Sequence, residues 1–467
     1  MLFFSLLVAA GIGLAVLGLL RGDLATIRSY PWLCLWLSLG VGLGICSSGF
    51  FIWSILFYPS EAYIPAEIGF LVTLIIALIY RISAKIPAAQ AQTRLEAPSG
   101  LWNFSLLHVS FYALLISSLL AFAFMSMARP HGGWDAWAVW NLRARFIFLG
   151  GERWMDGFSG VLPRSHPDYP LLLPALVARA WIYAGQNTVI APVLIAMVFT
   201  FATLGLLVSS LGILRDQTQG LIAGIVLMGT PFYLEHGASQ YADIPLGFFF
   251  LSTLVLFCLA ERLPTSSNSW MILTGLMAGF SAWTKHEGLL FLTSVIAVRL
   301  AVTLGRKRQR PERRHWFSFT IGLLPIFAMI GYFKFQVSPF HDPHLTQTLT
   351  LAIGKLGDPS RYLHVWKSFL SELPLFGGSI IHLPTVLICY ALLLGRSKLN
   401  EGLAFTTGIG ILGLMVVGYF FFYLITPYDL DYQVKTSLTR LQMQLWPSVL
   451  FTFFLLVKTP EQAIRAK

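Results

Sequence analysis

Long apolar runs recur along almost the whole chain and constrain its fold more than any other feature. Each run has about 18 or more residues, enough for a helix to cross a hydrocarbon core about 30 Å thick. Because backbone groups in lipid must be hydrogen-bonded within their own segment, helices are the form that such runs take. Only 11% of the residues are charged, against roughly a quarter in an average soluble domain. The sequence therefore predicts an all-α polytopic membrane protein with a single helical bundle.

We expect about thirteen transmembrane helices from these runs. Their approximate ranges are 1–20, 31–57, 64–81, 104–128, 188–213, 219–234, 242–260, 269–284, 287–304, 316–335, 376–395, 403–425 and 445–458. The segment 84–103, which includes AKIPAAQAQT, reads as a connector. It divides three accessory N-terminal helices (1–83) from a core that comprises residues 104–467.

The basic residues of the loops predict the orientation of the bundle. The densest cluster, RKRQRPERR at 306–314, should be cytoplasmic by the positive-inside rule, and the connector 84–103 then falls on the same side. The opposite, outer face receives the loops 129–187, 336–375 and 426–444. The net charge of +11 is scattered over loops, without a basic stripe interleaved with aromatic residues, which argues against a nucleic-acid partner. The four cysteines lie in apolar spans and predict neither disulfides nor a metal site.

The first outer loop places an acid among tryptophans. Asp135 lies between Trp134 and Trp137, directly after a predicted membrane helix, and Arg143 follows a few turns later. One interpretation is a solvated residue in the aromatic belt of the membrane interface. The other, which the nearby cations and a glycine pair favour, is a carboxylate with a chemical role.

The same loop contains SHPDYPLLLP at 165–174. Proline near the first turn of a helix explains the prolines of this motif. It does not explain why His166, Asp168 and Tyr169 cluster there, so a functional role and a structural one stay open.

The segment ALVARAWIYAG at 175–185 follows, and it is apolar apart from Arg179. If it crossed the membrane, the basic connector 84–103 would lie outside. We therefore expect an interfacial helix with Trp181 and Tyr183 at headgroup level.

Further ionisable groups fall on the same predicted face. They are Asp243 at the start of a membrane helix, just after Tyr241, then Lys285, His286 and Glu287 on a tight hairpin between two spans, and Arg440 before the last helix. Each has a structural alternative: an aspartate can cap a helix, a lysine can snorkel, and an arginine can anchor to headgroups. Ionisable groups at membrane depth are nevertheless candidates for function, and the arginine fork suits a phosphate.

Taken in chain order, these features resemble the GT-C superfamily of polytopic glycosyltransferases, within it the family of protein O-mannosyltransferases and aminoarabinose transferases. The resemblance covers residues 104 to 300, with a fainter match at 423–447. It is carried by Asp135 in the first outer loop, HPDYP before an interfacial helix, YAD ending at Asp243, and the TKHEG turn. It implies a GT-C-like bundle with interfacial helices in the long first outer loop of the core.

The resemblance also implies a reaction. A sugar would pass, with inversion, from a polyprenyl-phosphate donor to a lipid or glycan acceptor on the extracytoplasmic side. Asp135 then matches the catalytic base of the family and Asp243 its second acidic position. The adjacent acid pair typical of protein mannosyltransferases is absent, since Trp134 and Ala136 flank Asp135, which disfavours a protein acceptor.

The chemistry of the residues agrees with such a reaction. An inverting transfer needs a base on one side of the anomeric carbon and cations near the leaving phosphate on the other. Asp135 can supply the base. The candidate ligands of the donor phosphate are Lys285, Arg440, His166 and Arg143. The candidate substrate-binding residues are Trp134, Trp137, Tyr169, Tyr241, His286 and Glu287, the two tryptophans serving as a wall for a sugar ring or as an interfacial anchor.

Asp135 and Asp243 could also share a divalent cation such as Mg²⁺ or Mn²⁺ through oxygen ligands, although no spacing in the sequence requires it. The alternative function is a transporter or flippase of a lipid-linked glycan. Transporters usually place ionisable residues near the bilayer midplane on broken helices. Here such residues gather at helix ends on one face, which favours an enzyme. The short loops favour a bacterial inner membrane, with the site on the periplasmic face.

Overall fold

The computed structural model describes residues 1–21, 25–84, 105–162, 165–263, 266–305, 310–338, 349–379, 381–397 and 402–465. Across these residues the chain is helical apart from loops and one isolated β-bridge between Arg396 and Val457. The expected all-α class is therefore confirmed. The connector 84–103 lies outside the described residues except for its first residue, and the division of the chain there stays a prediction.

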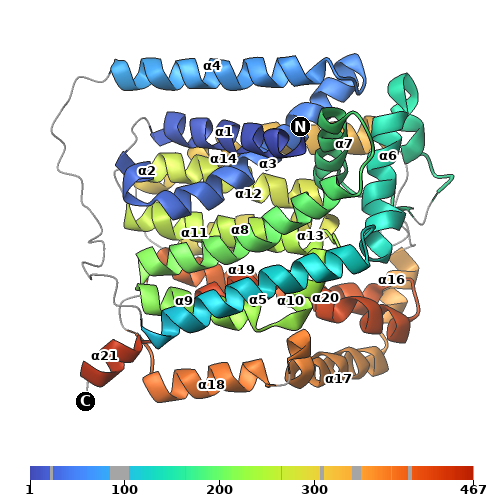
Figure 1. Cartoon of the computed structure of the whole chain (residues 1–467). Helices are drawn as coiled ribbons and strands as arrows, with labels where there is room; N and C mark the ends of the chain where they lie inside the picture. Colours follow the sequence, from blue (N-terminus) through green and yellow to red (C-terminus); the bar gives the residue numbers. More distant parts are fainter. Residues whose placement is uncertain are drawn as a thin grey trace.

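Figure 1 labels the main helices of the chain. The first part contains α1 (Leu2–Arg21), α2 (Ala25–Ser29), α3 (Pro31–Phe57), α4 (Tyr63–Ser83), α5 (Leu106–Ala128), the π-helical turn η1 (Ala136–Trp140), α6 (Asn141–Leu149), the 3-10 turn η2 (Gly151–Phe158) and α7 (Leu172–Ala184). The middle contains α8 (Ile190–Leu214), α9 (Gln217–Met228), α10 (Pro231–Ala238), α11 (Asp243–Arg262), α12 (Ser267–Thr284) and α13 (His286–Gly305). The last part contains α14 (Arg310–Tyr332), the π-helical turn η5 (Phe333–Val337), α16 (Leu349–Leu356), α17 (Pro359–Leu375), η6 (Phe376–Gly378), α18 (Leu383–Leu394), α19 (Leu403–Ile425), α20 (Leu430–Leu456) and α21 (Pro460–Arg465).

Nine helices of the described residues are long and apolar enough to cross a membrane, and the bent pair formed by α17 and α18 would make a tenth. By length and composition alone, the described residues thus contain fewer such helices than the thirteen or so spans expected from the sequence. The expected span 219–234 is divided between the short helices α9 and α10, because Pro231 starts a new helix after Thr230. The expected span 269–284 is α12, whose serine, threonine and asparagine residues lower its hydropathy. The expected span 445–458 is the end of the longer and more polar helix α20.

The long helices run alongside one another, and α6, α7, α16 and the beginning of α20 gather at one end of the bundle (Figure 1). Segments α2 and α21 lie at the opposite end (Figure 1). All the expected outer segments that the structure describes thus meet at a single end. Which end faces the cytoplasm stays a prediction.

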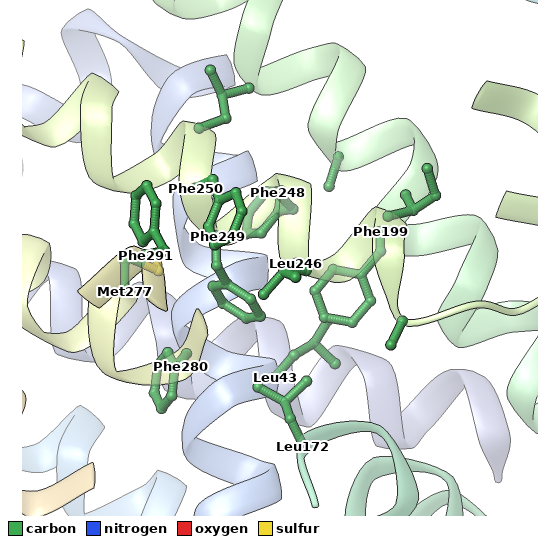
Figure 2. Packing of buried hydrophobic residues seen from close by; sticks show 14 of the residues in the cluster. Leu43, Leu172, Phe199, Leu246, Phe248, Phe249, Phe250, Met277, Phe280 and Phe291 are labelled. Atoms are coloured by element: carbon green, nitrogen blue, oxygen red, sulfur yellow. The ribbon is translucent and has the colours of Figure 1, made fainter. Parts of the chain in front are cut away.

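Helix α11 is the most buried of the nine helices that could cross a membrane among the described residues. Nearly all of its residues are buried, and it packs against α8, α12, α19 and α20. Phe248, Phe249 and Phe250 of this helix contact aromatic rings of neighbouring helices, including Phe291 with ring centroids 4.0 Å apart (Figure 2). Inside a bilayer such contacts stabilise mainly by close packing. The residue that begins α11, Asp243, is therefore held on a rigid part of the core.

Helix α7 lies across one end of the bundle, as expected for an interfacial helix, but it is covered (Figure 1). Helices α1, α3, α6 and α8 pack around it. Arg179 forms a buried ion pair with Glu67 of α4, with Nη2 and Oε2 2.7 Å apart. Trp181 and Tyr183 are buried as well. The expected position of these two aromatic residues at headgroup level is therefore wrong, because the helix is enclosed by its neighbours.

Candidate active site

Asp243 is the centre of a buried polar cluster at the end of the bundle where the outer segments meet. Its side chain is completely buried. Oδ2 accepts hydrogen bonds from Arg440 Nε at 3.1 Å and Nη2 at 2.8 Å. Oδ1 accepts from Gln444 Nε2 at 2.6 Å and from Lys285 Nζ at 3.2 Å. The N-cap of α11 is Ala242, so Asp243 does not serve as the helix cap. Its carboxylate instead organises three side chains from other elements.

Arg440 joins Asp243 to Asp135. Its Nη2 lies 2.6 Å from Asp135 Oδ2 and 2.8 Å from Asp243 Oδ2. The guanidinium also lies over the ring of Tyr241, 4.6 Å from the ring centroid. Burial lowers the pKa of Arg440, but the carboxylates of Asp243 and Asp135 outweigh this effect and raise it. The guanidinium therefore stays charged between the two acids.

The hairpin between α12 and α13 brings two more charges to this cluster. Lys285 Nζ lies 2.7 Å from Glu287 Oε1 in addition to its contact with Asp243. The turn is tight because Gly288 has no side chain: a Cβ there would lie 1.8 Å from the carbonyl oxygen of Ser281. Burial lowers the pKa of Lys285, whereas Asp243 and Glu287 raise it, with a net rise. The cluster thus contains two cations and three carboxylates, namely Lys285 and Arg440 with Asp135, Asp243 and Glu287.

Asp135 reaches the cluster because its loop is fastened to the connection between α10 and α11. The backbone N–H of Gly133 donates to the carbonyl of Ser239 at 3.0 Å. A Cβ on Gly133 would lie 2.5 Å from the hydroxyl of Tyr241, so this approach requires glycine. Asn141 Nδ2 donates to Gln240 Oε1 at 2.9 Å. The side chain of Asp135 keeps 23% of its surface exposed, whereas that of Asp243 keeps none.

Trp134 and Trp137 flank Asp135 at the surface. About half of each side chain is exposed, and their rings pack edge to face with centroids 4.5 Å apart. An exposed aromatic pair beside an accessible carboxylate can contact a sugar ring or the lipid interface.

His286 points away from the Asp243 cluster and belongs to a second group. Its Nε2 lies 3.3 Å from Asp168 Oδ2 and 2.8 Å from Lys334 Nζ. Its ring packs against Tyr169, with centroids 4.6 Å apart, and Tyr169 stacks on His166 at 4.7 Å. Since Lys285, His286 and Glu287 are consecutive, the hairpin connects the two groups directly.

Arg143 supports the second group from inside the protein. It is completely buried, donates to the carbonyl oxygen of Tyr169, and its guanidinium carbon lies 5.3 Å from the ring centroid of Phe158. Burial lowers the pKa of Arg143 to about 9, although the carboxylate of Asp168 opposes this effect. Arg143, which the sequence suggested as a ligand of the donor phosphate, therefore lies behind Tyr169 in this structure.

Three side chains of the two groups were not expected. Gln444 lies one helical turn after Arg440 and so on the same face of α20, which is the one signal that could have revealed it. Tyr419 of α19 donates to Gln444 Oε1 at 2.8 Å and fixes the orientation of that amide. Lys334 lies at the end of a predicted span, where snorkelling is the ordinary explanation of a lysine.

The acids do not form a site for a divalent cation in this arrangement. No group of three or more His, Cys, Asp or Glu residues suited to a metal ion occurs in the part of the chain that the structure describes. The guanidinium of Arg440 lies between Asp135 and Asp243, where a shared cation would have to lie. The donor set therefore does not fit the Mg²⁺ or Mn²⁺ considered from the sequence.

A separate cavity of about 500 Å³ opens beside α6 and η2. Arg145, Arg153 and Asp156 are among its lining residues, together with apolar side chains of the same loop. It includes neither the Asp243 cluster nor the group around His286.

Residues 166–332 match the family model of the dolichyl-phosphate-mannose-protein mannosyltransferases. No curated protein and no solved structure matches the chain. The matched part includes Asp243, the hairpin 285–287 and His166, Asp168 and Tyr169 of the group around His286, whereas Asp135, Arg143, Lys334 and Arg440 lie outside it. The family resemblance expected from the sequence is thereby confirmed: this part of the chain is similar to a family of polytopic membrane glycosyltransferases of the GT-C superfamily.

Proposed function

We propose that the protein is an inverting glycosyltransferase that transfers a sugar from a polyprenyl-phosphate donor to a hydroxyl group of a lipid or glycan acceptor. The reaction would take place on the extracytoplasmic face, in a bacterium the periplasmic face of the inner membrane. The observation that carries the proposal is the meeting of Asp135, Asp243, Lys285 and Arg440 at one end of the bundle. The family match supports the class of reaction and the lipid-linked donor.

Asp135 is the proposed base. Its side chain is the most exposed of the three carboxylates in the cluster, 23% against 18% for Glu287 and 0% for Asp243, so an acceptor can reach it. The acceptor oxygen would attack the anomeric carbon while its proton passes to the Asp135 carboxylate. The bond between that carbon and the phosphate oxygen would break, and its electron pair would leave with polyprenyl phosphate. Attack from the side opposite the phosphate inverts the configuration of the sugar.

Asp243 has a different proposed role. It is completely buried and both of its oxygens accept hydrogen bonds, so it is poorly placed to take a proton from an acceptor. We assign it to positioning Arg440 and Lys285. Both cations keep their charge because the acids raise their pKa, and the charge can stabilise the phosphate as it leaves. This proposed positioning role differs from a direct catalytic role for Asp243, the second acidic position that the resemblance implied, and the transfer assay can distinguish the two.

The membrane supplies a reason for the location of the site. A polyprenyl tail stays in lipid, so the donor phosphate must be met near the interface, at the ends of the helices. The exposed pair formed by Trp134 and Trp137 lies there beside the proposed base and can hold a sugar ring. A transporter would instead be expected to place its ionisable residues near the middle of the bilayer.

The proposal is tested by replacing Asp135 with asparagine in purified protein reconstituted in liposomes. A panel of labelled polyprenyl-phosphate sugars is supplied, and the release of polyprenyl phosphate is measured in the presence of a lipid extract as acceptor. We expect transfer by the wild type, and a rate in Asp135→Asn that is about 10²- to 10⁴-fold lower. The affinity for the donor should change little, because the cations remain.

Asp156→Asn is the matched control, since Asp156 lies in the same loop and forms an exposed ion pair with Arg153. It should transfer at the wild-type rate. Full activity in Asp135→Asn would remove the proposed base. Movement of the labelled lipid across the membrane without transfer would show a transporter instead.

A further inference from the structure

We propose that Lys334, together with His286, binds the phosphate of the lipid donor. The identity of this phosphate as part of a sugar donor rests on the proposed function. The proposal adds to the site a residue from the π-helical turn η5, which follows α14.

The contacts of Lys334 place it in the second group. Its Nζ lies 2.8 Å from His286 Nε2 and 3.9 Å from Asp168 Oδ2, and it donates to the backbone carbonyl of Asp168. A quarter of its side chain is exposed, 25% against 8% for Lys285. Lys285 is also held by two carboxylates, Asp243 and Glu287. Lys334 is therefore the cation that a ligand can reach more easily.

The local backbone supports a functional role. In the described ranges of the chain there are two π-helical turns, η1 and η5. The first starts directly after Asp135, and the second contains Lys334. Such turns are rare and occur frequently at functional sites, because they displace one residue from the regular helical pattern. Both turns of this chain thus accompany residues of the two polar groups.

The order of contacts separates Lys334 from the proposed base. Asp135 contacts Arg440, Arg440 contacts Asp243, and Asp243 contacts Lys285. Lys285 is followed in the chain by His286, which contacts Lys334. An inverting transfer needs its leaving group on the side of the anomeric carbon opposite the base. Lys334 is the cation of this series that is separated from Asp135 by the most contacts, and through His286 it adjoins Lys285, so the two lysines can receive the leaving phosphate together.

The charges around Lys334 also favour an anion. Asp168 is the carboxylate of this group, and Lys334 and the buried Arg143 are its cations. The imidazoles of His166 and His286 add no negative charge. A phosphate oxygen can replace His286 Nε2 as a partner of the ammonium, while the bond from Lys334 to the carbonyl of Asp168 holds the side chain in place.

The test measures binding of a short-chain polyprenyl phosphate to the purified protein in detergent, so that it needs no knowledge of the sugar. Lys334→Met should weaken binding about 10- to 100-fold, the effect of losing one contact to a charged group. Lys334→Arg, which keeps the charge, should recover most of the affinity. The matching polyprenol, which lacks the phosphate, should bind the wild type and Lys334→Met equally.

Lys355→Met is the matched control. Lys355 also donates to a backbone carbonyl, that of Thr426 at 2.8 Å, whereas Lys334 contacts His286. It should bind the lipid phosphate like the wild type. If Lys334→Met does not fold, Lys334→Gln gives the same readout.

Unchanged affinity of the folded Lys334 variant for the lipid phosphate would overturn the proposal, as would an equal loss for the polyprenol, which would show a structural effect. In the transfer assay, Lys334→Met should raise the KM for the donor, whereas Asp135→Asn should lower kcat. Lipid phosphate binding that depends on Lys334 in a protein without transfer activity would uphold this site and refute the glycosyltransferase.

Discussion

Replacing Glu67 with glutamine removes the negative charge from the buried ion pair that joins α4 to α7. Arg179 Nε and Nη2 approach the carboxylate at distances from 2.7 to 3.0 Å. The hydroxyls of Tyr63 and Tyr183 donate to the same carboxylate at 2.8 and 2.7 Å. Both charged side chains are buried, so water cannot replace a lost partner. In Glu67→Gln the guanidinium of Arg179 is left as a buried charge without its counter-ion.

The expected cost is about 3–5 kcal/mol of unfolding free energy, the range found when one member of a buried ion pair is removed. Arg179→Met should cost a similar amount, since it leaves the carboxylate of Glu67 alone. The double variant Glu67→Met/Arg179→Met removes both charges and should be at least about 2 kcal/mol more stable than either single variant. A double variant that is more stable than either single variant is the distinctive result, because two independent losses would add.

The measurement is equilibrium unfolding in mixed micelles with increasing denaturing detergent, followed by circular dichroism. Asp156→Asn, which breaks the exposed pair with Arg153, is the control and should change the stability little. Wild-type stability in Glu67→Gln would contradict the buried pair. A double variant that loses the sum of the two single effects would show that the side chains act independently.

Two further predictions concern the Asp243 cluster. Asp243→Asn removes the charge that holds Arg440 and Lys285. It should lower the transfer rate at least 10²-fold and the unfolding free energy by about 3–5 kcal/mol, measured in the assays above. Normal transfer activity would contradict the positioning role. Because the pKa of Lys285 is raised above its ordinary value of 10.5, its stabilising charge is fully present below that pH and is lost as the pH rises through the folded-state pKa. The stability difference between the wild type and Lys285→Met should therefore be constant from pH 6 to 9 and shrink only above about 10.5, and a difference that shrinks near pH 8 would refute the raised pKa.

The apolar runs were sufficient to predict the class of fold, because the bilayer imposes the length and composition of a spanning helix. They were not sufficient to count the spans. Pro231 divides one run into two short helices, and α20 extends an apolar end with a polar beginning. Hydropathy averages over such local features.

The candidate site was predicted in part. Asp135, Asp243 and Arg440 were found because an ionisable residue at the end of a membrane helix needs an explanation. That they would form one cluster follows from the fold, since Arg440 and Asp135 are 305 residues apart. Arg179 was expected in an interfacial helix because the local sequence gives no sign of its ion pair. Its partner, Glu67, is 112 residues away in the chain.

The fold also explains why the two aspartates of the cluster differ in exposure, 0% for Asp243 against 23% for Asp135. Asp243 starts a helix that is almost completely buried, and it contacts Arg440, Lys285 and Gln444. The positions of those side chains are thus fixed by the packed core. Asp135 stands in a loop that is fastened to the connection before α11 and keeps part of its surface exposed. A catalyst of sugar transfer needs this division, because the charges that stabilise the leaving phosphate must be fixed in advance, whereas the base must be accessible to an acceptor that comes from outside.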